Sequence, residues 1–292
     1  MNSDLNDVFE WGQMNEDISS NEYLKLQLDK FAISTDMQIQ NKLTSDLMLR
    51  YAEMSNMLEK NNKLLTKYNE QLEDMVDEKV KDISDLQMAT IYSLVKLSES
   101  RDDDTGAHII RTSTLCKVLA ELLKGKQMYK QIIDDDFVEN IFKASPLHDI
   151  GKVGIPDRIL LKPGKLTYDE FEIMKTHVTI GYNTLKEVRD KFPNSLFLEM
   201  GMDIVKYHHE KWDGSGYPNG VSGRDISLPG RIIAIIDVYD ALRSKRVYKE
   251  AYTHEESCSI LKKGSGKHFD PFIVDVFLEY NETIKDIHYK LG

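Results

Sequence analysis

The sequence is poor in cysteine and has no long hydrophobic run. Its 292 residues include only Cys116 and Cys258, which do not form a Cys-x-x-Cys pair. We therefore expect neither a disulfide framework nor a cysteine-based structural zinc site. No apolar stretch approaches the roughly 18 residues that a membrane span needs, and the N-terminus lacks a basic region followed by an apolar one. We expect a cytoplasmic protein without a membrane span.

The chain also has fewer basic than acidic residues. The chain has 38 Lys and Arg residues against 49 Asp and Glu residues, so its formal net charge is -11 at pH 7. This balance argues against a general binder of nucleic acid polymers or of anionic membranes. If the substrate is an anion, bound metal and local Lys or Arg side chains must make the electrostatic potential at the site positive.

Proline and glycine are both absent from residue 38 to residue 100, which favours a long helix. Apolar residues recur there at alternating steps of four and three, with Asn61 in one seam position, and the seam steps by four twice after Leu72. A single helix packed on its own domain is the alternative, but the sustained heptads favour a coiled coil and a homodimer. The seam comprises Leu47, Tyr51, Met54, Leu58, Asn61, Leu65, Tyr68, Leu72, Val76, Val80 and Ile83.

The pattern predicts three parts: an acidic, loosely ordered arm over residues 1–37, the signalling helix over 38–90, and one domain over 91–292. The domain shows helical periodicity and no convincing period-two run of strand length, so the fold class is all-α. The expected helices are Ile109 to Leu123, Phe137 to Leu147, Tyr168 to Val188, Gly201 to His209, Ile232 to Leu242, His254 to Leu261 and Pro271 to Tyr280.

Histidine and aspartate form two adjacent groups in this domain. His148 and Asp149 lie in the string HDIGK, and His208 and His209 open the string HHEKWDGSGYP. Imidazole and carboxylate are ligands that borderline divalent metals prefer. One such pair is usually a capping or surface pair, but two clusters in a chain with eight histidines indicate a metallohydrolase. Adjacent ligands reach one metal cluster only at a helix end or bend, and Gly151 gives freedom for that bend.

Five further polar residues are candidates for the same site. Asp237 lies in the apolar run RIIAIIDVYDAL, where a carboxylate is costly unless it is paired or bound to metal. Asp240, three residues on, competes with it and could instead orient a ligand. Lys152 is well placed to bind a phosphate or to protonate a leaving group. His108 follows Asp104 by four residues, so one helical turn could put both on one face. His177 lies on an expected helix, where a single histidine is more often partly exposed.

The remaining histidines, His254, His268 and His288, lie in polar segments of the sequence. We expect all three to be exposed and structural.

Taken together, the strings resemble the HD-GYP family, bacterial phosphodiesterases of the HD superfamily that hydrolyse cyclic di-GMP. The resemblance covers roughly residues 90–285 and includes DVYDALRSKRVYK at 237–249. It implies an HD-domain helical bundle, preceded here by the long N-terminal helix. It also implies metal ligation by His108, His148, Asp149, His177, His208, His209 and Asp237.

The resemblance further implies the roles of five residues. Asp149 and Lys152 are the expected catalytic residues, with Lys152 against the scissile phosphate. Tyr217, Arg246 and Lys249 are expected to hold the guanine and phosphate groups of the substrate.

The expected cofactors are two divalent metal ions, iron or manganese rather than zinc, because the ligand set has no thiolate. A third metal is the alternative through Asp104, but this position is Glu in the members that hold one, and aspartate is one methylene shorter. The cations bring about four positive charges and the two ligating aspartates with a bridging hydroxide return about three, so the centre stays cationic. Attack by that hydroxide on cyclic di-GMP would give pGpG, and GMP if the product rebinds.

Two other functions stay open. The same site could act on cyclic GMP-AMP, because the sequence does not show how each base is read. The chain could instead be an adaptor that senses a cyclic dinucleotide and acts through contacts of a glycine-rich loop around Trp212 to Pro218, the GYP loop. The expected partner is then a diguanylate cyclase (GGDEF) domain.

Overall fold

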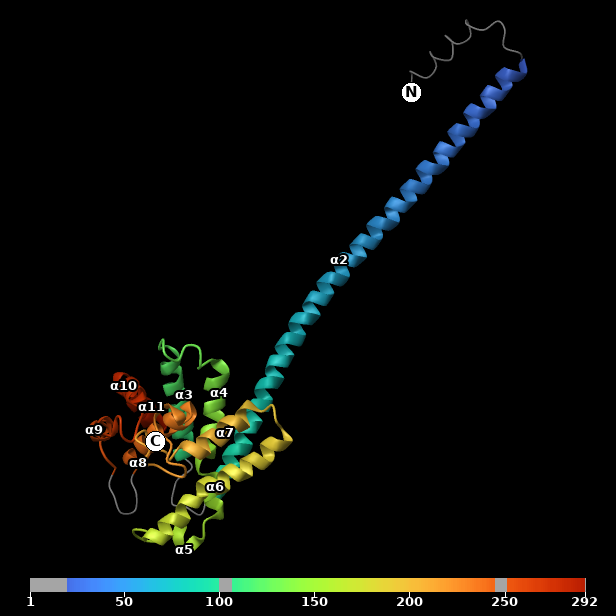
Figure 1. The fold of residues 1–292 in the computed structure, drawn as a ribbon. Coiled ribbons are helices and arrows are strands. Elements are labelled where there is room, and N and C mark those ends of the chain that lie inside the picture. The colour runs from blue at the N-terminus through green and yellow to red at the C-terminus, as the bar shows by residue number, and fades with distance from the viewer. Residues whose placement is uncertain (1–19, 100–106, 245–250, 292) are drawn as a thin grey trace. The chain divides into compact units, whose positions relative to one another are not determined.

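The computed structural model describes residues 20–99, 107–244 and 251–291. Within these ranges the chain is helical and has no strand, only an isolated bridge between Ser265 and Phe269. The prediction of an all-α fold is confirmed (Figure 1). No helix in this described part is both long and apolar enough to cross a membrane.

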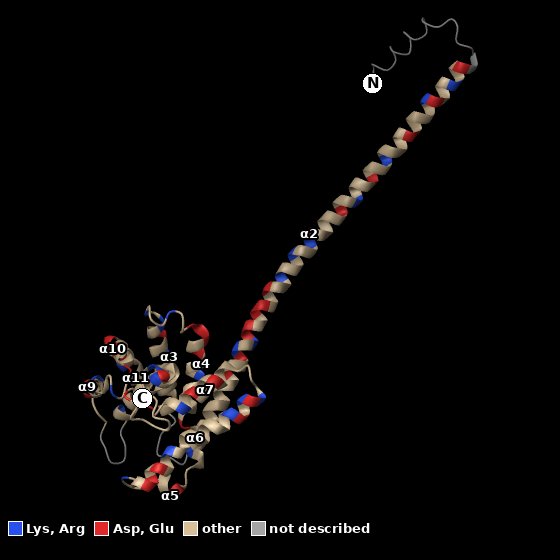
Figure 2. Ribbon diagram, in the orientation of Figure 1, with Lys and Arg blue, Asp and Glu red and all other residues tan. Residues whose placement is uncertain are grey.

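The longest element is α2, Ser20–Glu99, a helix of 80 residues. It begins within the segment expected to be a loosely ordered arm. Its apolar seam side chains, from Leu47 to Ile83, are all exposed in the single chain. Lys and Arg are interspersed with Asp and Glu along the helix (Figure 2).

The chain divides into two compact units, Met1–Lys81 and Asp82–Gly292. The second unit contains the last turns of α2 and the remaining helices. These are α3 (Ala107–Lys124), α4 (Asp135–Ala144), η2 (Ser145–Gly154), α5 (Asp157–Leu160), α6 (Tyr168–Lys191), α7 (Leu196–Tyr207), η3 (Gly223–Asp225), α8 (Leu228–Arg243), α9 (His254–Gly264), α10 (Pro271–Glu279) and α11 (Asn281–Leu291).

Side-chain caps fix several helix starts in this unit. Thr167 and Thr253 each begin a helix with a capping box, in which Glu170 and Glu256 return the hydrogen bond to the cap residue. Asp134 caps α4 by accepting a hydrogen bond from the Phe137 amide at 2.7 Å. These caps fix the residues at which α4, α6 and α9 begin, close to the starts expected from the apolar periodicity.

The helix α11 is not among the expected helices, because its segment is short and largely polar. Its apolar residues Ile284 and Ile287 nevertheless pack into the main hydrophobic core. This core lies among α3, α4 and α8 to α11, and it ties the end of the chain to the centre of the unit.

A second, smaller core contains Val95 from the last turns of α2 and Ile109 from α3, next to His108. Leu147 and Val205, from η2 and α7, belong to the same core. Two hydrophobic cores therefore adjoin the elements that carry the histidine and aspartate clusters.

Two glycines allow η2 to approach α6 closely. A Cβ atom on Gly151 would lie 1.9 Å from the carbonyl oxygen of His177 and 2.6 Å from the nitrogen of Gly181. The φ angle of Gly151 is not in the left-handed region. Gly151 is therefore needed for space and not for the conformational freedom that we expected from the sequence. The contact brings Asp149 beside His177.

Candidate metal centre

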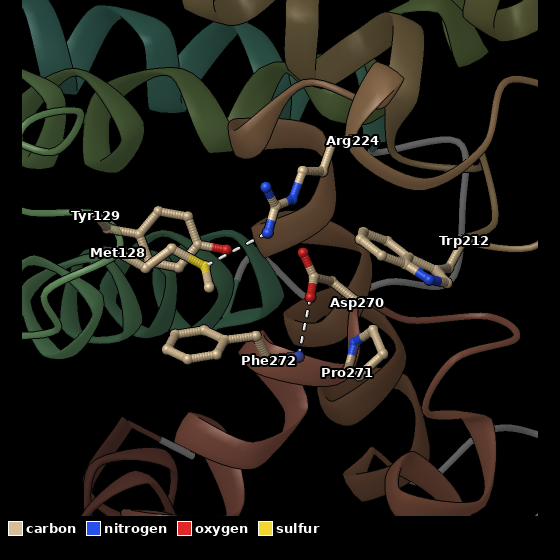
Figure 3. Close-up of a pocket in the computed structure, with 7 residues that line it drawn as sticks. All are labelled: Met128, Tyr129, Trp212, Arg224, Asp270, Pro271 and Phe272. Carbon is tan, nitrogen blue, oxygen red and sulfur yellow. Dashed lines mark hydrogen bonds between the residues drawn. The ribbon is translucent and has the colours of Figure 1, made fainter.

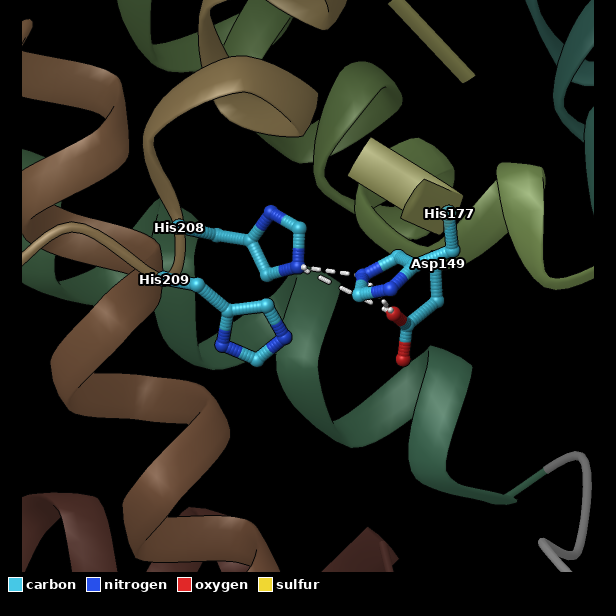
Figure 4. A group of neighbouring side chains, drawn as sticks. All are labelled: Asp149, His177, His208 and His209. Atoms are coloured by element: carbon cyan, nitrogen blue, oxygen red, sulfur yellow. Dashed lines mark hydrogen bonds and ion pairs between the residues drawn. The ribbon is translucent and has the colours of Figure 1, made fainter. Parts of the chain in front are cut away.

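Asp149, His177, His208 and His209 form the first of two groups of potential metal ligands. One ligand atom from each lies within 4.8 Å of the others. Oδ1 of Asp149 is 3.3 Å from Nε2 of His177 and 3.7 Å from Nε2 of His208. Asp149 comes from η2 and His177 from α6, while His208 and His209 directly follow α7; the four side chains point toward one another (Figure 4).

His108, His148 and Asp237 form the second group, with ligand atoms also within 4.8 Å of one another. Oδ1 of Asp237 lies 3.7 Å from Nε2 of His108 and 3.9 Å from Nε2 of His148. Asp237 is half-buried, whereas Asp240 on the same helix is fully buried. The structure thus brings the seven predicted ligands together in two groups.

The carboxylate of Asp149 links the groups. Its Oδ1 faces the first group, while its Oδ2 lies 3.3 Å from Nε2 of His148 in the second. One carboxylate directed at two ligand groups is an arrangement suited to two neighbouring cations.

Four of the histidines have a defined tautomer when neutral. Nδ1 of His148, His177 and His208 faces backbone carbonyl oxygens at 2.7 to 3.1 Å, and Nδ1 of His108 faces a carboxylate oxygen of Asp240 at 2.7 Å. Because these oxygens only accept hydrogen bonds, each Nδ1 must carry the proton. Each Nε2 therefore presents a lone pair toward the cluster.

Among the described residues, no donor satisfies two of the acceptor atoms at this centre. Nε2 of His148 and Oδ1 of Asp149 are buried without a hydrogen-bond partner, and Nε2 of His177 lies 3.4 Å from Nε2 of His208. Converging, unsatisfied lone pairs in a buried place are costly unless a cation neutralises them. The donor set therefore fits divalent metal ions.

The pKa values of the cluster follow the same electrostatics. Burial lowers the pKa of His177 to about 4 and that of His209 well below its usual value. Burial opposes protonation of His148 too, but the charges of Asp149 and Asp237 raise its pKa to about 10. Burial would raise the pKa of Asp149, yet Lys152 and the imidazoles hold it well below its usual value. Positive charge is thus favoured at His148, next to the two carboxylates, and disfavoured at His177 and His209.

Lys152 and Tyr217 border the cluster. Nζ of Lys152 is 2.8 Å from Oδ2 of Asp149.

The ring of Tyr217 lies 4.7 Å from that of His209, measured between centroids, and 6.0 Å from that of Phe171. Nζ of Lys175 lies 5.6 Å from the centre of the Tyr217 ring. Burial raises the pKa of Tyr217, so its hydroxyl stays a hydrogen-bond donor. Sequence reasoning missed Phe171 and Lys175.

Glu210, a second residue that we did not single out, holds the GYP loop. Its buried side chain accepts hydrogen bonds from the amides of Asn219 and Gly220 at 2.7 and 3.2 Å. The amide of Tyr217 bonds the carbonyl oxygen of His209 at 3.2 Å. These bonds fix the loop that presents Tyr217 to the cluster.

The expectation that His254 and His288 are exposed is wrong, because they are only 3% and 8% exposed. His268 is half-buried and stacks on Phe269 at 4.2 Å between ring centroids. The two buried histidines hydrogen-bond to other buried polar side chains, which explains how a polar segment lies in the interior.

A separate cavity of about 150 Å³ lies beside the GYP loop (Figure 3). Trp212 and Arg224 line it together with Tyr129 and Phe272. Nη2 of Arg224 approaches the sulfur of Met128 at 3.9 Å. None of the residues that line this cavity belongs to the two ligand groups.

Three residues of the predicted site, Asp104, Arg246 and Lys249, lie outside the described part of the chain. The structure therefore neither supports nor opposes their expected roles.

Comparison with known proteins gives the family. Residues 53–273 match the HD domain family. A probable cyclic di-GMP phosphodiesterase of Vibrio cholerae is 44% identical, over 78% of this chain and 52% of that protein. A cyclic di-GMP phosphodiesterase of the same organism is 45% identical over 75% of this chain and 45% of that protein, and a 3'3'-cGAMP-specific phosphodiesterase 2 is 41% identical over 68% and 36%.

The chain belongs to the HD domain family, and its HDIGK and HHEKWDGSGYP strings place it among the HD-GYP members. It spans about half the length of the first two relatives. The family and the two ligand groups together support divalent metal binding by this chain.

Proposed function

We propose that this protein is a metal-dependent phosphodiesterase that hydrolyses cyclic di-GMP to pGpG, and further to GMP if the product rebinds. The observation that carries the proposal is the convergence of seven imidazole and carboxylate side chains on a buried centre, with a lysine at its edge. Relatives at 44% and 45% identity are named for cyclic di-GMP hydrolysis.

The two ligand groups would each hold one divalent cation, and iron or manganese suits their mixed imidazole and carboxylate ligands better than zinc. The cations would supply Lewis-acid activation of water and of the phosphoryl group. Asp149 would serve both positions, because its two oxygens face different groups.

The residues around the centre have separate tasks. Lys152 would place its charge against the phosphoryl oxygens as negative charge develops there. Tyr217 would present its ring face and its hydroxyl to the substrate, and the GYP loop bonds of Glu210 keep it in place. By family resemblance, Arg246 and Lys249 would complete the hold on the guanine and phosphate groups.

The direct test is turnover by purified, metal-replete protein, with products identified by mass spectrometry and metals quantified in the same sample. We expect linear pGpG and two metal ions per chain. A double variant, His148→Ala with Asp149→Ala, is the matched inactive control. Protein that binds cyclic di-GMP and both metals but leaves the substrate intact would refute the proposed reaction.

Cyclic GMP-AMP is the second candidate substrate, favoured by the relative that is named 3'3'-cGAMP-specific. Both dinucleotides share the phosphodiester ring and differ in one base. Parallel turnover assays at equal concentration decide between them through the ratio of kcat/KM values.

We also propose that the chain forms a homodimer through α2. Ten apolar side chains of the heptad seam are exposed in the single chain, and an apolar stripe of this length needs a partner in water. The stripe continues into the second unit, where Leu86, Leu94 and Leu97 are exposed. Light scattering on a truncated form that lacks residues 1–85 tests this, and an unchanged oligomer would oppose it.

The adaptor function remains a second role of the same chain. Trp212 of the GYP loop lines a cavity with Tyr129 and Phe272, and aromatic side chains around a small cavity are typical of docking surfaces. A diguanylate cyclase (GGDEF) domain is the proposed partner. If the His148→Ala, Asp149→Ala variant kept full cellular function, contacts and not hydrolysis would carry the biological role.

A further inference from the structure

Asp240 is the centre of a buried polar network beside the second ligand group. It is fully buried, and among the described residues five hydrogen bonds from four side chains converge on it, the longest from the hydroxyl of Ser244 at 3.5 Å. Arg111 donates from Nε at 2.6 Å and from Nη2 at 2.9 Å, and Nδ1 of His108 donates at 2.7 Å. Nε2 of His288, on the last helix, lies 3.0 Å from the other carboxylate oxygen.

This network makes His108 different from three other histidines of the centre. The Nδ1 atoms of His148, His177 and His208 bond to carbonyl oxygens within their own segments, so local backbone geometry orients those rings. The ring of His108 is oriented by a side chain 132 residues away. A carboxylate partner also makes an imidazole more basic and thus a stronger ligand. The second ligand group therefore depends on whatever fixes Asp240.

His288 is one of the groups that fix Asp240. It is 8% exposed, and α11, which carries it, packs against α3. Because a carboxylate only accepts hydrogen bonds, Nε2 of His288 must carry the proton in this contact. Without this donor, a buried oxygen of Asp240 would lose one of its partners, and the carboxylate would be held less firmly in the orientation that meets His108.

We propose that His288 is a positioning residue of the metal centre. By holding Asp240, it orients His108 and raises the metal affinity of the position formed by His108, His148 and Asp237. The last helix of the chain is then part of the metal site, although it contributes no ligand. This inference rests on the proposed metal centre.

Two variants test the proposal by replacing His288 with an amide side chain, either the longer glutamine or the shorter asparagine. Gln places its NH₂ group about where histidine has Nε2, whereas Asn is shorter and falls short of Asp240. Mn²⁺ is titrated calorimetrically into chelator-treated full-length protein, and bound metal is counted after dialysis. We expect His288→Asn to weaken one of two sites about 10- to 100-fold and His288→Gln to restore most of the affinity. The other site should keep its affinity in both variants.

His254 provides the matched control. It is equally buried, at 3% exposure, but it bonds Tyr239 and Asn281 instead of Asp240. His254→Asn should destabilise the fold to a similar extent and leave both metal affinities unchanged. If His288→Asn binds two Mn²⁺ ions as tightly as the unmodified protein, or if His254→Asn loses metal equally, the positioning role is wrong. If the unmodified protein binds no Mn²⁺ at all, the proposed metal centre itself fails.

Discussion

The Nζ atom of Lys152 lies 2.8 Å from Oδ2 of Asp149, one helical turn earlier in η2. The lysine therefore reaches the edge of the ligand cluster, where the proposed function places the phosphoryl group. Such a fixed charge is most valuable when negative charge develops in the transition state.

We predict that Lys152→Met lowers kcat for cyclic di-GMP about 100- to 1,000-fold, in the range measured for the loss of one preorganised electrostatic group. The metal content should stay at the unmodified level, because Lys152 is not a ligand. Lys162→Met is the control, since Lys162 pairs with Glu170 at the start of α6. Equal losses of activity in both variants would contradict a specific role of Lys152.

A second prediction concerns the two oxygen atoms of the Asp149 carboxylate. His177→Ala should remove one metal ion and His108→Ala the other, because each histidine belongs to a different ligand group. Asp149→Ala should remove both, since its oxygens face both groups. Metal analysis after exhaustive dialysis measures this. A single remaining metal in Asp149→Ala would mean that the carboxylate serves one position only.

Local patterns in the sequence single out five of the seven residues that the structure groups, whereas His108 and His177 were named as ligands only through the family resemblance. His148 and Asp149 occur in a short string next to a glycine, and the apolar run around Asp237 makes its carboxylate conspicuous. Such local patterns are visible without knowledge of the fold. The structure adds the division into two groups, which no local pattern contains.

The surrounding network was harder to predict, since it joins residues far apart in the chain. His288 bonds Asp240 across 48 residues and Arg111 bonds it across 129. Ile284, Ile287 and Leu291 recur at helical spacing around His288, but the segment is short and largely polar, and its helix was not expected. One signal was available: Arg111 follows His108 by one helical turn on an otherwise apolar helix face, where a charge needs a partner.

The third prediction tests the seam of α2. Leu58 occupies a seam position and Leu49 lies on the opposite side of the helix, yet both are exposed in the single chain, at 61% and 62%. Leu58→Lys should raise the dissociation constant of the dimer by about tenfold or more, because it places two charges in a seam where each buried leucine contributes about 1.5 to 3 kcal/mol. Sedimentation velocity across a concentration series measures it.

Leu49→Lys is the matched control for this experiment. It makes the same chemical change at the same exposure but away from the seam, so the dissociation constant should stay unchanged. Equal weakening by both variants would indicate an effect on helix stability in general. No weakening by Leu58→Lys would remove the heptad seam as the dimer interface.

The last prediction concerns the contact that brings Asp149 to His177. A Cβ atom on Gly151 would overlap the backbone of α6, at 1.9 Å from the carbonyl oxygen of His177, and backbone cannot yield as a side chain can. Gly151→Ala should therefore lower the free energy of unfolding by about 3 kcal/mol or more, the upper end of what overpacking costs. The substitution should also separate Asp149 from His177 and release metal, because η2 must move away from α6.

Gly154→Ala, three residues later in the same segment, is the matched control. Its new Cβ would meet only the side chain of Ile180, with Cδ1 at 2.9 Å, and this flexible end can turn aside. Denaturant unfolding and metal analysis of both variants separate the two cases. If Gly151→Ala keeps the unmodified stability and both metal ions, then close contact between η2 and α6 is not what assembles the centre.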